Sequence, residues 1–306
     1  MADVIEVRSL TMRYGDLVAV DDVSFSVRQG EVFGILGPNG AGKTTTLECI
    51  EGIQRPTAGG ITVLDTGVRQ DPNAVKLQIG VQLQVSAYFD YLTLNEILDL
   101  FARFYGQERS AADLLTTVGL ADKANTTVEK LSAGQKQRFT IAATLVNDPE
   151  IVFLDEPTAN LDPQARRNLW EFVREINQRG KTIVLTTHYM EEAEYLCDRV
   201  AIMDQGRIVA MDSPVNLIRE LPVPYEITAA TDSGYDRDRL VSLASVMELA
   251  NDSDGGFTLH SSDAADTLPA LLQWAASSQI RLTHLEVTPG NLESVFLSLT
   301  GRALRD

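Results

Sequence analysis

The octapeptide at residues 37–44, GPNGAGKT, constrains the fold of this chain more than any other feature. It matches the pattern G-x-x-x-x-G-K-[ST], in which a glycine-rich turn joins a buried strand to a helix. The flanks fit, because an apolar run at 30–36 precedes the turn and a helical pattern from Lys43 to about Gly52 follows it. We therefore expect a strand, a phosphate-binding turn and a helix in succession.

The backbone of this turn supplies its chemistry. Glycines 37, 40 and 42 let the N–H groups point inward at phosphate oxygens, and the helix that follows adds the positive end of its dipole. We expect Lys43 to bridge the β- and γ-phosphates of a nucleotide and Thr44 to offer its hydroxyl to Mg²⁺. The predicted nucleotide-binding residues here are Gly37, Pro38, Asn39, Gly40, Ala41, Gly42, Lys43, Thr44 and Thr45.

A second candidate site lies where an apolar strand, IVFL at residues 151–154, ends in Asp155 and Glu156. The first carboxylate is placed to hold Mg²⁺ through water at the carboxyl end of the strand. The second is placed to polarise an attacking water as a general base. An acidic pair before Pro157 can instead simply cap a turn. The phosphate-binding turn elsewhere in the chain favours the catalytic interpretation.

Strand and helix patterns alternate through most of the chain, which predicts an α/β fold with a mainly parallel sheet wrapped by helices. Two β-rich segments come first, and three helical patterns form a helical insert at about 85–145. The expected segments are strands at 4–10, 17–27, 30–36, 151–154 and 182–186, with helices at 43–52, 94–105, 110–119, 135–147 and 163–178.

The pattern changes at Pro222 and Pro224, which predict a boundary between a domain at 1–220 and a smaller one at 221–306. The tail resembles a split βαβ arrangement, with helices on one antiparallel sheet, and is therefore expected to be an α+β domain. Its expected strands lie at 225–230, 247–251, 256–260 and 281–287, and its expected helices at 237–246, 264–277 and 291–299.

Composition narrows the classes of function. The 43 acidic residues outnumber the 26 basic ones and give a net charge of −17, which disfavours a nucleic-acid partner. Cys49 and Cys197 form no metal-binding or disulfide pattern, as expected in a reducing cytoplasm. The N-terminus does not resemble a secretion signal, and no run reaches the roughly 18 apolar residues that span a bilayer. A membrane role would therefore need a partner chain.

A third motif, LSAGQ at residues 131–135, narrows the choice among nucleotide hydrolases. With it the chain resembles the ABC (ATP-binding cassette) ATPase family, whose signature is LSGGQ; Ala133 departs from that pattern. The resemblance covers about residues 4–220. It implies a P-loop cassette with a RecA-like parallel core, an antiparallel β subdomain and a helical subdomain. It also implies that Ser132, Gly134 and Gln135 of one subunit close over the γ-phosphate bound by another.

Four further positions match the family in order. Tyr14 resembles the aromatic residue that stacks on adenine, and His188 the catalytic histidine that contacts the γ-phosphate. Gln84 resembles the glutamine that touches Mg²⁺ and senses the membrane partner, with Gln82 as a rival two positions earlier. Asp162 belongs to a loop that resembles the one joining the two subunits.

The resemblance implies an ATP hydrolase that uses ATP and Mg²⁺. It implies a head-to-tail homodimer, or a pair with a similar ATPase, attached to separate transmembrane permease subunits at the cytoplasmic face of the membrane. Residues 85–90 and the helical insert are the expected docking surface for the permease.

The end of the chain, NLESVFLSLTGR at 291–302, resembles the drug-export branch that includes daunorubicin-resistance ATPases. This resemblance implies export of a drug or antibiotic, a lipid or a polysaccharide. The same helix is also expected to bury its apolar side against the tail. An importer ATPase with a regulatory tail and a non-transport ABC ATPase are the alternatives.

Overall fold

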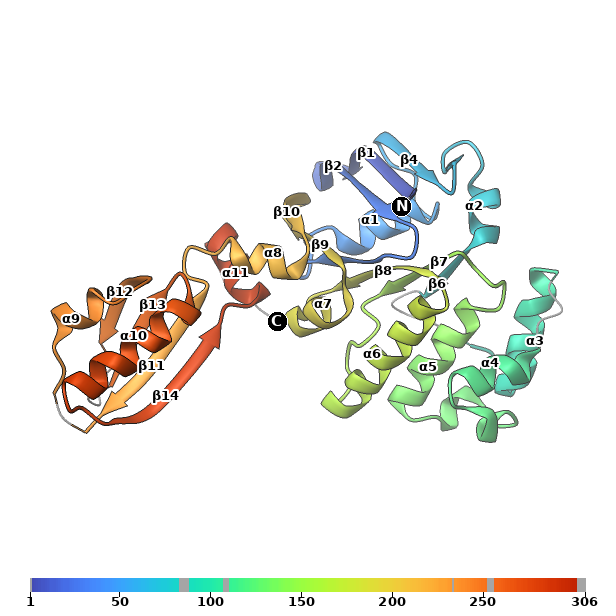
Figure 1. Ribbon diagram of the computed structural model, residues 1–306. Coiled ribbons are helices and arrows are strands. Elements are labelled where there is room, and N and C mark those ends of the chain that lie inside the picture. The colour runs from blue at the N-terminus through green and yellow to red at the C-terminus, as the bar shows by residue number, and fades with distance from the viewer. Residues whose placement is uncertain (1, 83–87, 107–109, 233, 252–255, 302–306) are drawn as a thin grey trace. The chain divides into compact units, whose positions relative to one another are not determined.

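The computed structural model describes residues 2–82, 88–106, 110–232, 234–251 and 256–301 (Figure 1). The chain forms two compact units that divide between Pro214 and Val215. The sequence places the boundary at the later prolines, Pro222 and Pro224. The division falls earlier because α8 (Pro214–Arg219) groups almost entirely with the second unit.

A six-stranded sheet forms the centre of the first unit, in the order β10-β9-β3-β8-β7-β6. The strands from β9 to β6 are parallel, and only the edge strand β10 is antiparallel. Every residue of β3, β7 and β8 is buried, as expected for apolar strands covered on both faces. The strands are β3 (Val32–Leu36), β6 (Ile79–Gln82), β7 (Ile151–Asp155), β8 (Thr182–Thr187), β9 (Arg199–Asp204) and β10 (Arg207–Asp212).

A four-stranded antiparallel sheet lies beside it in the order β2-β1-β4-β5 (Figure 1). Helix α1 (Lys43–Ile50) contacts strands of both sheets, and its Leu47, Cys49 and Ile50 are buried in one continuous apolar core. Packing against both sheets fixes where α1 begins, just beyond the carboxyl end of β3. The strands are β1 (Asp3–Tyr14), β2 (Leu17–Arg28), β4 (Ala58–Val63) and β5 (Thr66–Gly67).

The remaining helices of this unit include α3, α4 and α5, which contact one another, and α6 and α7, which follow the acidic strand and β8. Helix α3 begins with a capping box, because Thr93 and Glu96 satisfy each other's backbone N–H groups. The helices are α2 (Pro72–Gln78), α3 (Leu94–Phe104), α4 (Ala111–Thr117), α5 (Ala133–Thr144), α6 (Pro163–Gln178) and α7 (Met190–Leu196), with 3₁₀ turns at Ala121–Lys123 and Val128–Lys130.

The second unit is an antiparallel sheet in the order β12-β13-β11-β14 with helices packed on it. This arrangement matches the split βαβ pattern expected from the sequence. Helix α9 ends at Val241, earlier than expected, and Ser245 then adopts a positive φ of 61° before the next strand. The elements are β11 (Tyr225–Thr231), α9 (Arg237–Val241), β12 (Val246–Asn251), β13 (Gly256–Ser261), α10 (Ala264–Ser277), β14 (Leu282–Pro289) and α11 (Leu292–Thr300).

The predicted fold class is thus confirmed: a parallel α/β core, an antiparallel β sheet, a set of helices and a small α+β tail. Within the described ranges, no helix is both long and apolar enough to cross a membrane.

The central sheet depends on complete burial of strand β7, which can be tested at Phe153. Its side chain is 0% exposed, so Phe153→Ala leaves a cavity and is expected to lower the free energy of unfolding by about 3–5 kcal/mol. Urea unfolding followed by circular dichroism measures the change. Tyr91→Ala, at a side chain 94% exposed, is the control, with an expected effect within about 0.5 kcal/mol.

Candidate functional site

The glycine-rich turn wraps around the amine of Lys43. This side chain is only 4% exposed, and its Nζ donates hydrogen bonds to the carbonyl oxygens of Gly37 (2.9 Å) and Pro38 (3.2 Å). Two positions of the turn require glycine, because a Cβ atom there would collide with a backbone carbonyl oxygen. A Cβ at position 37 would lie 2.2 Å from the Met203 carbonyl oxygen, and one at Gly42, where φ is 100°, would lie 2.3 Å from the Ala19 carbonyl oxygen.

The turn opens directly into the N-terminus of α1. Gly42 caps this helix without a side-chain hydrogen bond, and the first turn carries no acidic residue. Its leading N–H groups are therefore available to an anion. Asn39 and Gly40 are exposed, whereas Thr44 and Thr45 are partly buried. The predicted phosphate-binding residues thus form one continuous turn with access to solvent.

Asp155 ends β7 and points at the same helix terminus. The hydroxyl of Thr44 donates to its carboxylate, with Oγ1 lying 3.1 and 3.2 Å from the two oxygens, and Thr186 of β8 donates a second hydrogen bond. Burial raises the pKa of Asp155, whereas the hydrogen bonds from Thr186 and Thr44 oppose that rise. Two of the three predicted protein ligands of Mg²⁺, Thr44 and Asp155, therefore lie in contact with each other.

Glu156 follows in a left-handed backbone conformation, with φ of 46°. Its backbone N–H donates to both the hydroxyl oxygen (3.0 Å) and the carbonyl oxygen (3.2 Å) of Thr186. A positive φ is uncommon for a residue with a side chain. Here it turns the Glu156 carboxylate away from the course of β7 and toward the phosphate-binding turn.

The Glu156 carboxylate lies between two cationic or ionisable groups. Lys43 Nζ lies 3.3 Å from Oε1, and His188 Nδ1 lies 3.2 Å from Oε2. Glu156 and His188 directly follow β7 and β8, and Lys43 begins α1 after the turn that follows β3. These three strands are neighbours in the sheet. The structure therefore brings together the residues that the sequence proposes for phosphate binding, water activation and γ-phosphate contact.

Of the two candidate glutamines, only Gln82 belongs to the described residues. Gln82 ends β6, is 3% exposed and donates from Nε2 to the carbonyl oxygen of Asp155 at 3.4 Å. Its Oε1 is buried, and no described residue forms a hydrogen bond with it. Gln84, the preferred metal-contacting residue, lies outside the described residues. Gln82 thus links the last parallel strand to the acidic pair.

The signature segment forms a second helix N-terminus. Ser132 caps α5 through a capping box with Gln135, so that the helix begins at Ala133, slightly earlier than expected. Ser132 and Ala133 are exposed, and a Cβ at Gly134 would lie 3.2 Å from Cβ of Ala165. Asp162 likewise caps α6 by accepting the N–H of Ala165 at 2.9 Å.

These outer residues are separate from the phosphate-binding turn. Within the part of the chain that the structure describes, no hydrogen bond or ion pair joins Ser132, Gln135 or Asp162 to that turn. Tyr14, the candidate adenine-stacking residue, is 44% exposed at the end of β1. One chain therefore gathers the turn, the acidic pair and His188, and it leaves the signature segment exposed elsewhere.

Thr186 is a residue of this site that sequence reasoning missed. It is 0% exposed, and its hydroxyl joins Asp155 to the backbone of Glu156. The neighbouring Thr187 hydroxyl accepts the N–H of Tyr189, and the Thr187 carbonyl accepts that of Gly37. The available signal was two consecutive threonines at the end of an apolar strand, directly before His188.

Two further acids on α1 face the same region. Burial raises the pKa of Glu51 from an ordinary 4.5 to about 8, and the charges of Asp155 and Glu48 act in the same direction. Burial and Asp155 also raise the pKa of Glu48. Burial and these neighbouring charges therefore keep Glu51 protonated near neutral pH.

Comparison with known proteins places the chain among transport ATPases. The family model described as ABC transporter matches residues 20–159. The chain is 39% identical over 308 residues to Nod factor export ATP-binding protein I of Burkholderia orbicola, covering 99% of this chain and 98% of that protein. It is 36% identical to the linearmycin resistance ATP-binding protein LnrL of Bacillus subtilis, covering 99% of this chain and 100% of that protein.

Solved structures also resemble this chain over about two thirds of its length. The structure of an ATP-binding subunit of an ABC transporter matches with a TM-score of 0.64 and 30% identity, covering 71% of this chain and 92% of that one. A dimeric ATP-binding cassette bound to ADP and Pi, in a post-hydrolysis state, matches with a TM-score of 0.62 and 25% identity. That match covers 68% of this chain and 98% of the other.

Thr186→Val tests whether this hydroxyl orders the acidic pair. Valine keeps the shape of the side chain but removes the two hydrogen bonds of the Thr186 hydroxyl, one to the Asp155 carboxylate and one from the Glu156 N–H. We therefore expect ATP hydrolysis to fall about 10- to 100-fold. It also raises the pKa of Asp155 further, so activity is lost at a higher pH on the acid side than in the wild type. Thr182→Val, at the other end of β8, is the matched control and leaves the pH profile unchanged.

Glu51→Gln tests the electrostatics of α1 through stability. The folded chain holds this proton up to a pH of about 8, whereas an exposed glutamate loses it near 4.5. The unfolding free energy of the wild type therefore falls as pH rises from about 4.5 to about 8. The unfolding free energy of the variant falls less over the same interval, and the difference is on the order of a few kcal/mol. Unfolding at pH 5 and pH 8 measures both slopes, and equal slopes would contradict the assignment.

Proposed function

We propose that this chain, which belongs to the ATP-binding subunits of the ABC transporter family, powers export of a drug or antibiotic, a lipid or a polysaccharide through separate membrane subunits. The resemblance seen in the sequence is confirmed, and the chain is an ATPase of that family. The observation that carries the proposed chemistry is the placement of Glu156 between Lys43 and His188.

The phosphate-binding turn holds the triphosphate of ATP in this proposal. Lys43 exchanges its contacts with the Gly37 and Pro38 carbonyls for phosphate oxygens, and the leading N–H groups of α1 bind further ones. Tyr14 stacks on the adenine. Thr44 and Asp155 suit Mg²⁺, because a hydroxyl and a carboxylate are hard oxygen ligands and already lie 3.1 Å apart. When bound, the ion neutralises charge on the β- and γ-phosphates. Gln84 is the further proposed ligand.

Glu156 is the proposed general base. Its carboxylate orients a water molecule and takes up a proton as the water oxygen bonds to the γ-phosphorus. The bond from the γ-phosphorus to the bridging oxygen breaks, and ADP leaves with the bonding electron pair. His188, 3.2 Å from Glu156, holds this geometry and contacts the γ-phosphate. Thr186 fixes the backbone from which Glu156 projects.

We propose that Ser132, Gly134 and Gln135 of a second subunit complete the site. In one chain these residues are exposed or partly buried at the start of α5, where the helix terminus suits an anion. A head-to-tail homodimer, or a pair with a similar ATPase, brings each signature segment over the γ-phosphate held by the partner. Asp162, at the start of α6, lies in the loop proposed to join the two chains. A solved cassette that this chain resembles is dimeric, which supports the pairing of two subunits.

Export rests on relatives that cover the whole chain. One is described as a Nod factor export protein and the other as a linearmycin resistance protein. The tail, which resembles the drug-export branch, is included in both matches. ABC cassettes work with membrane subunits, and we place this one at the cytoplasmic face. The permease docks on the helical insert in this proposal; of the expected docking residues 85–90, only 88–90 belong to the described part.

Glu156→Gln tests the assignment of the general base. The amide cannot accept the proton of the attacking water, so ATP hydrolysis is expected to fall about 10²- to 10⁴-fold while ATP binding is kept. A phosphate-release assay and a fluorescent-nucleotide titration measure the two quantities. Glu175→Gln, at an exposed position of α6, is the control. Normal hydrolysis by the Glu156 variant would show that another group activates the water.

Mixing two inactive variants tests the shared site. Lys43→Ala disables the phosphate-binding turn and Ser132→Arg disables the signature segment, so each variant alone is expected to be inactive. In a head-to-tail pair of the two, one site combines both defects and the other is intact, so mixing restores up to about a quarter of wild-type hydrolysis. If each site were contained within one chain, every site in the mixture would carry a defect and no activity would return.

A further inference from the structure

Arg166, in the first turn of α6, is connected to the catalytic centre through an aromatic ring. Its guanidinium carbon lies 3.9 Å from the centroid of the Tyr189 ring, within the range at which a cation is attracted to an aromatic face. The Tyr189 ring lies against the imidazole of His188, with ring centroids 4.1 Å apart. His188 Nδ1 lies 3.2 Å from the Glu156 carboxylate. The four side chains therefore form one continuous series of contacts.

The imidazole of His188 has few other restraints. The backbone beside it is held, because the Tyr189 N–H donates to the Thr187 hydroxyl at 2.9 Å. The side chain itself is 19% exposed, and no described residue forms a hydrogen bond with its Nδ1, although the Glu156 carboxylate is near. Contact with the Tyr189 ring therefore restrains the direction in which the imidazole points.

Arg166 is in turn held by α6 and α7. Its backbone N–H donates to the Asp162 carbonyl oxygen at 2.9 Å. Glu192 of α7 is 0% exposed and accepts a hydrogen bond from Trp170 Nε1 of α6 at 2.9 Å, which joins the two helices. Burial raises the pKa of Glu192, whereas its hydrogen bonds and the positive charge of Arg166 oppose that rise. The guanidinium therefore lies in the field of a buried acid.

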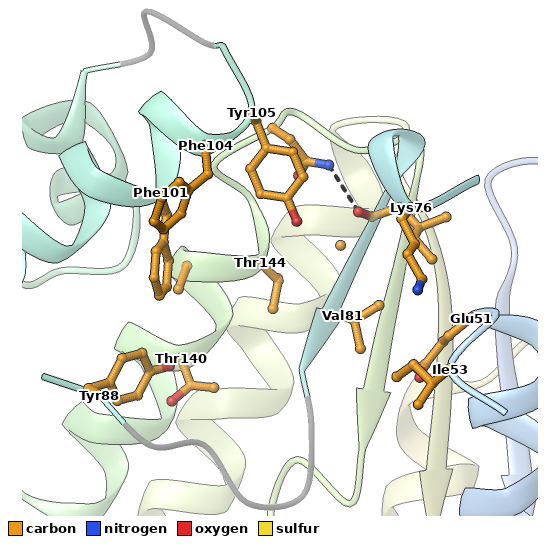
Figure 2. A pocket seen from close by; sticks show the side chains of 14 residues that line it. Glu51, Ile53, Lys76, Val81, Tyr88, Phe101, Phe104, Tyr105, Thr140 and Thr144 are labelled. Carbon is orange, nitrogen blue, oxygen red and sulfur yellow. Dashed lines mark hydrogen bonds between the residues drawn. The ribbon is translucent and has the colours of Figure 1, made fainter. Parts of the chain in front are cut away.

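The first turn of α6 also contacts α5. A Cβ at Gly134, in the signature segment, would lie 3.2 Å from Cβ of Ala165, the residue before Arg166. Farther along α5, Thr140 and Thr144 line a groove of about 510 Å³ beside the helical insert (Figure 2). Arg166 therefore lies at the place where α5, α6 and the loop after β8 meet.

We propose that Arg166 is a positioning residue for ATP hydrolysis, which stacks on Tyr189 and thereby holds the His188 imidazole toward the γ-phosphate. The inference rests on the proposed function and adds a residue that acts through Tyr189 rather than on the nucleotide. Packing alone does not account for a cation here. The Nε of Arg166 is buried, and no described residue forms a hydrogen bond with it, a cost that an apolar side chain would avoid.

The same two helices supply a matched control. Arg174 of α6 lies over the Tyr195 ring of α7, with its guanidinium carbon 4.8 Å from the ring centroid. Tyr195 stacks on Trp170, with centroids 5.2 Å apart, and not on a residue of the catalytic centre. Arg174→Gln therefore removes a cation from an aromatic ring of α7 while the contacts of His188 stay the same.

Arg166→Gln is expected to lower kcat for ATP hydrolysis by the full chain about 10- to 100-fold, because the γ-phosphate contact is no longer held in one geometry. The KM for ATP is expected to stay within about twofold, since the phosphate-binding turn is unchanged. Arg174→Gln is expected to change neither constant. A phosphate-release assay over a range of ATP concentrations measures both.

Tyr189 variants test the route by which Arg166 acts. Tyr189→Phe keeps the ring and is expected to keep kcat within about twofold, whereas Tyr189→Leu is expected to lower it as Arg166→Gln does. Adding Arg166→Gln to Tyr189→Leu is expected to cause no further loss, because the ring through which arginine acts is already absent. Losses that multiply in the double variant would show that the two residues act independently, which overturns the proposal.

The remaining outcomes separate this proposal from the proposed function. An unchanged kcat for Arg166→Gln, or an equal loss for Arg174→Gln, overturns the positioning role. If Glu156→Gln still abolishes hydrolysis in that case, the assignment of the general base stands. If Arg166→Gln does not fold, as judged by circular dichroism, the comparison of Tyr189→Leu with Tyr189→Phe decides, and equal kcat values for these two overturn the proposal.

Discussion

The carboxylate of Glu156 lies 3.3 Å from Lys43 Nζ and 3.2 Å from His188 Nδ1, and the arrangement of the first unit serves to hold it there. Three neighbouring parallel strands end at one edge of the sheet, each presenting one of these residues or its turn. The backbone of Glu156 adopts a positive φ, which Thr186 secures through two hydrogen bonds. A positive φ in a residue with a side chain costs conformational free energy. Such strain is expected at a site whose chemistry requires the side chain to point in one direction.

Much of this site follows from local sequence. The turn at 37–44 is recognisable from its own residues, and the structure requires glycine at 37 and 42, where a Cβ would meet the carbonyl oxygens of Met203 and Ala19. Apolar runs such as IVFL and TIVLT predict buried parallel strands, and parallel strands place their carboxyl ends together. The meeting of Lys43, Glu156 and His188 therefore follows from motif and strand pattern together.

Other features depend on contacts that sequence periodicity does not encode. Thr186 becomes a site residue only because β8 lies between β3 and β7, and Glu51 is a buried acid only because of how the end of α1 packs within the first unit. The unit boundary before Val215 reflects how α8 packs, whereas the prolines mark only where helix is interrupted. Short strands such as β5 and β6 have too few residues for a clear pattern.

We propose that ATP joins two chains, because one chain holds the phosphates and its partner supplies the signature segment. Analytical ultracentrifugation of Glu156→Gln, whose ATP stays unhydrolysed, tests it most directly. With Mg²⁺ and ATP we predict a species of twice the 33.5 kDa chain mass, which returns to one chain mass with ADP or after Ser132→Arg is added. A species of one chain mass at saturating ATP, with nucleotide bound, would show that ATP does not join two chains.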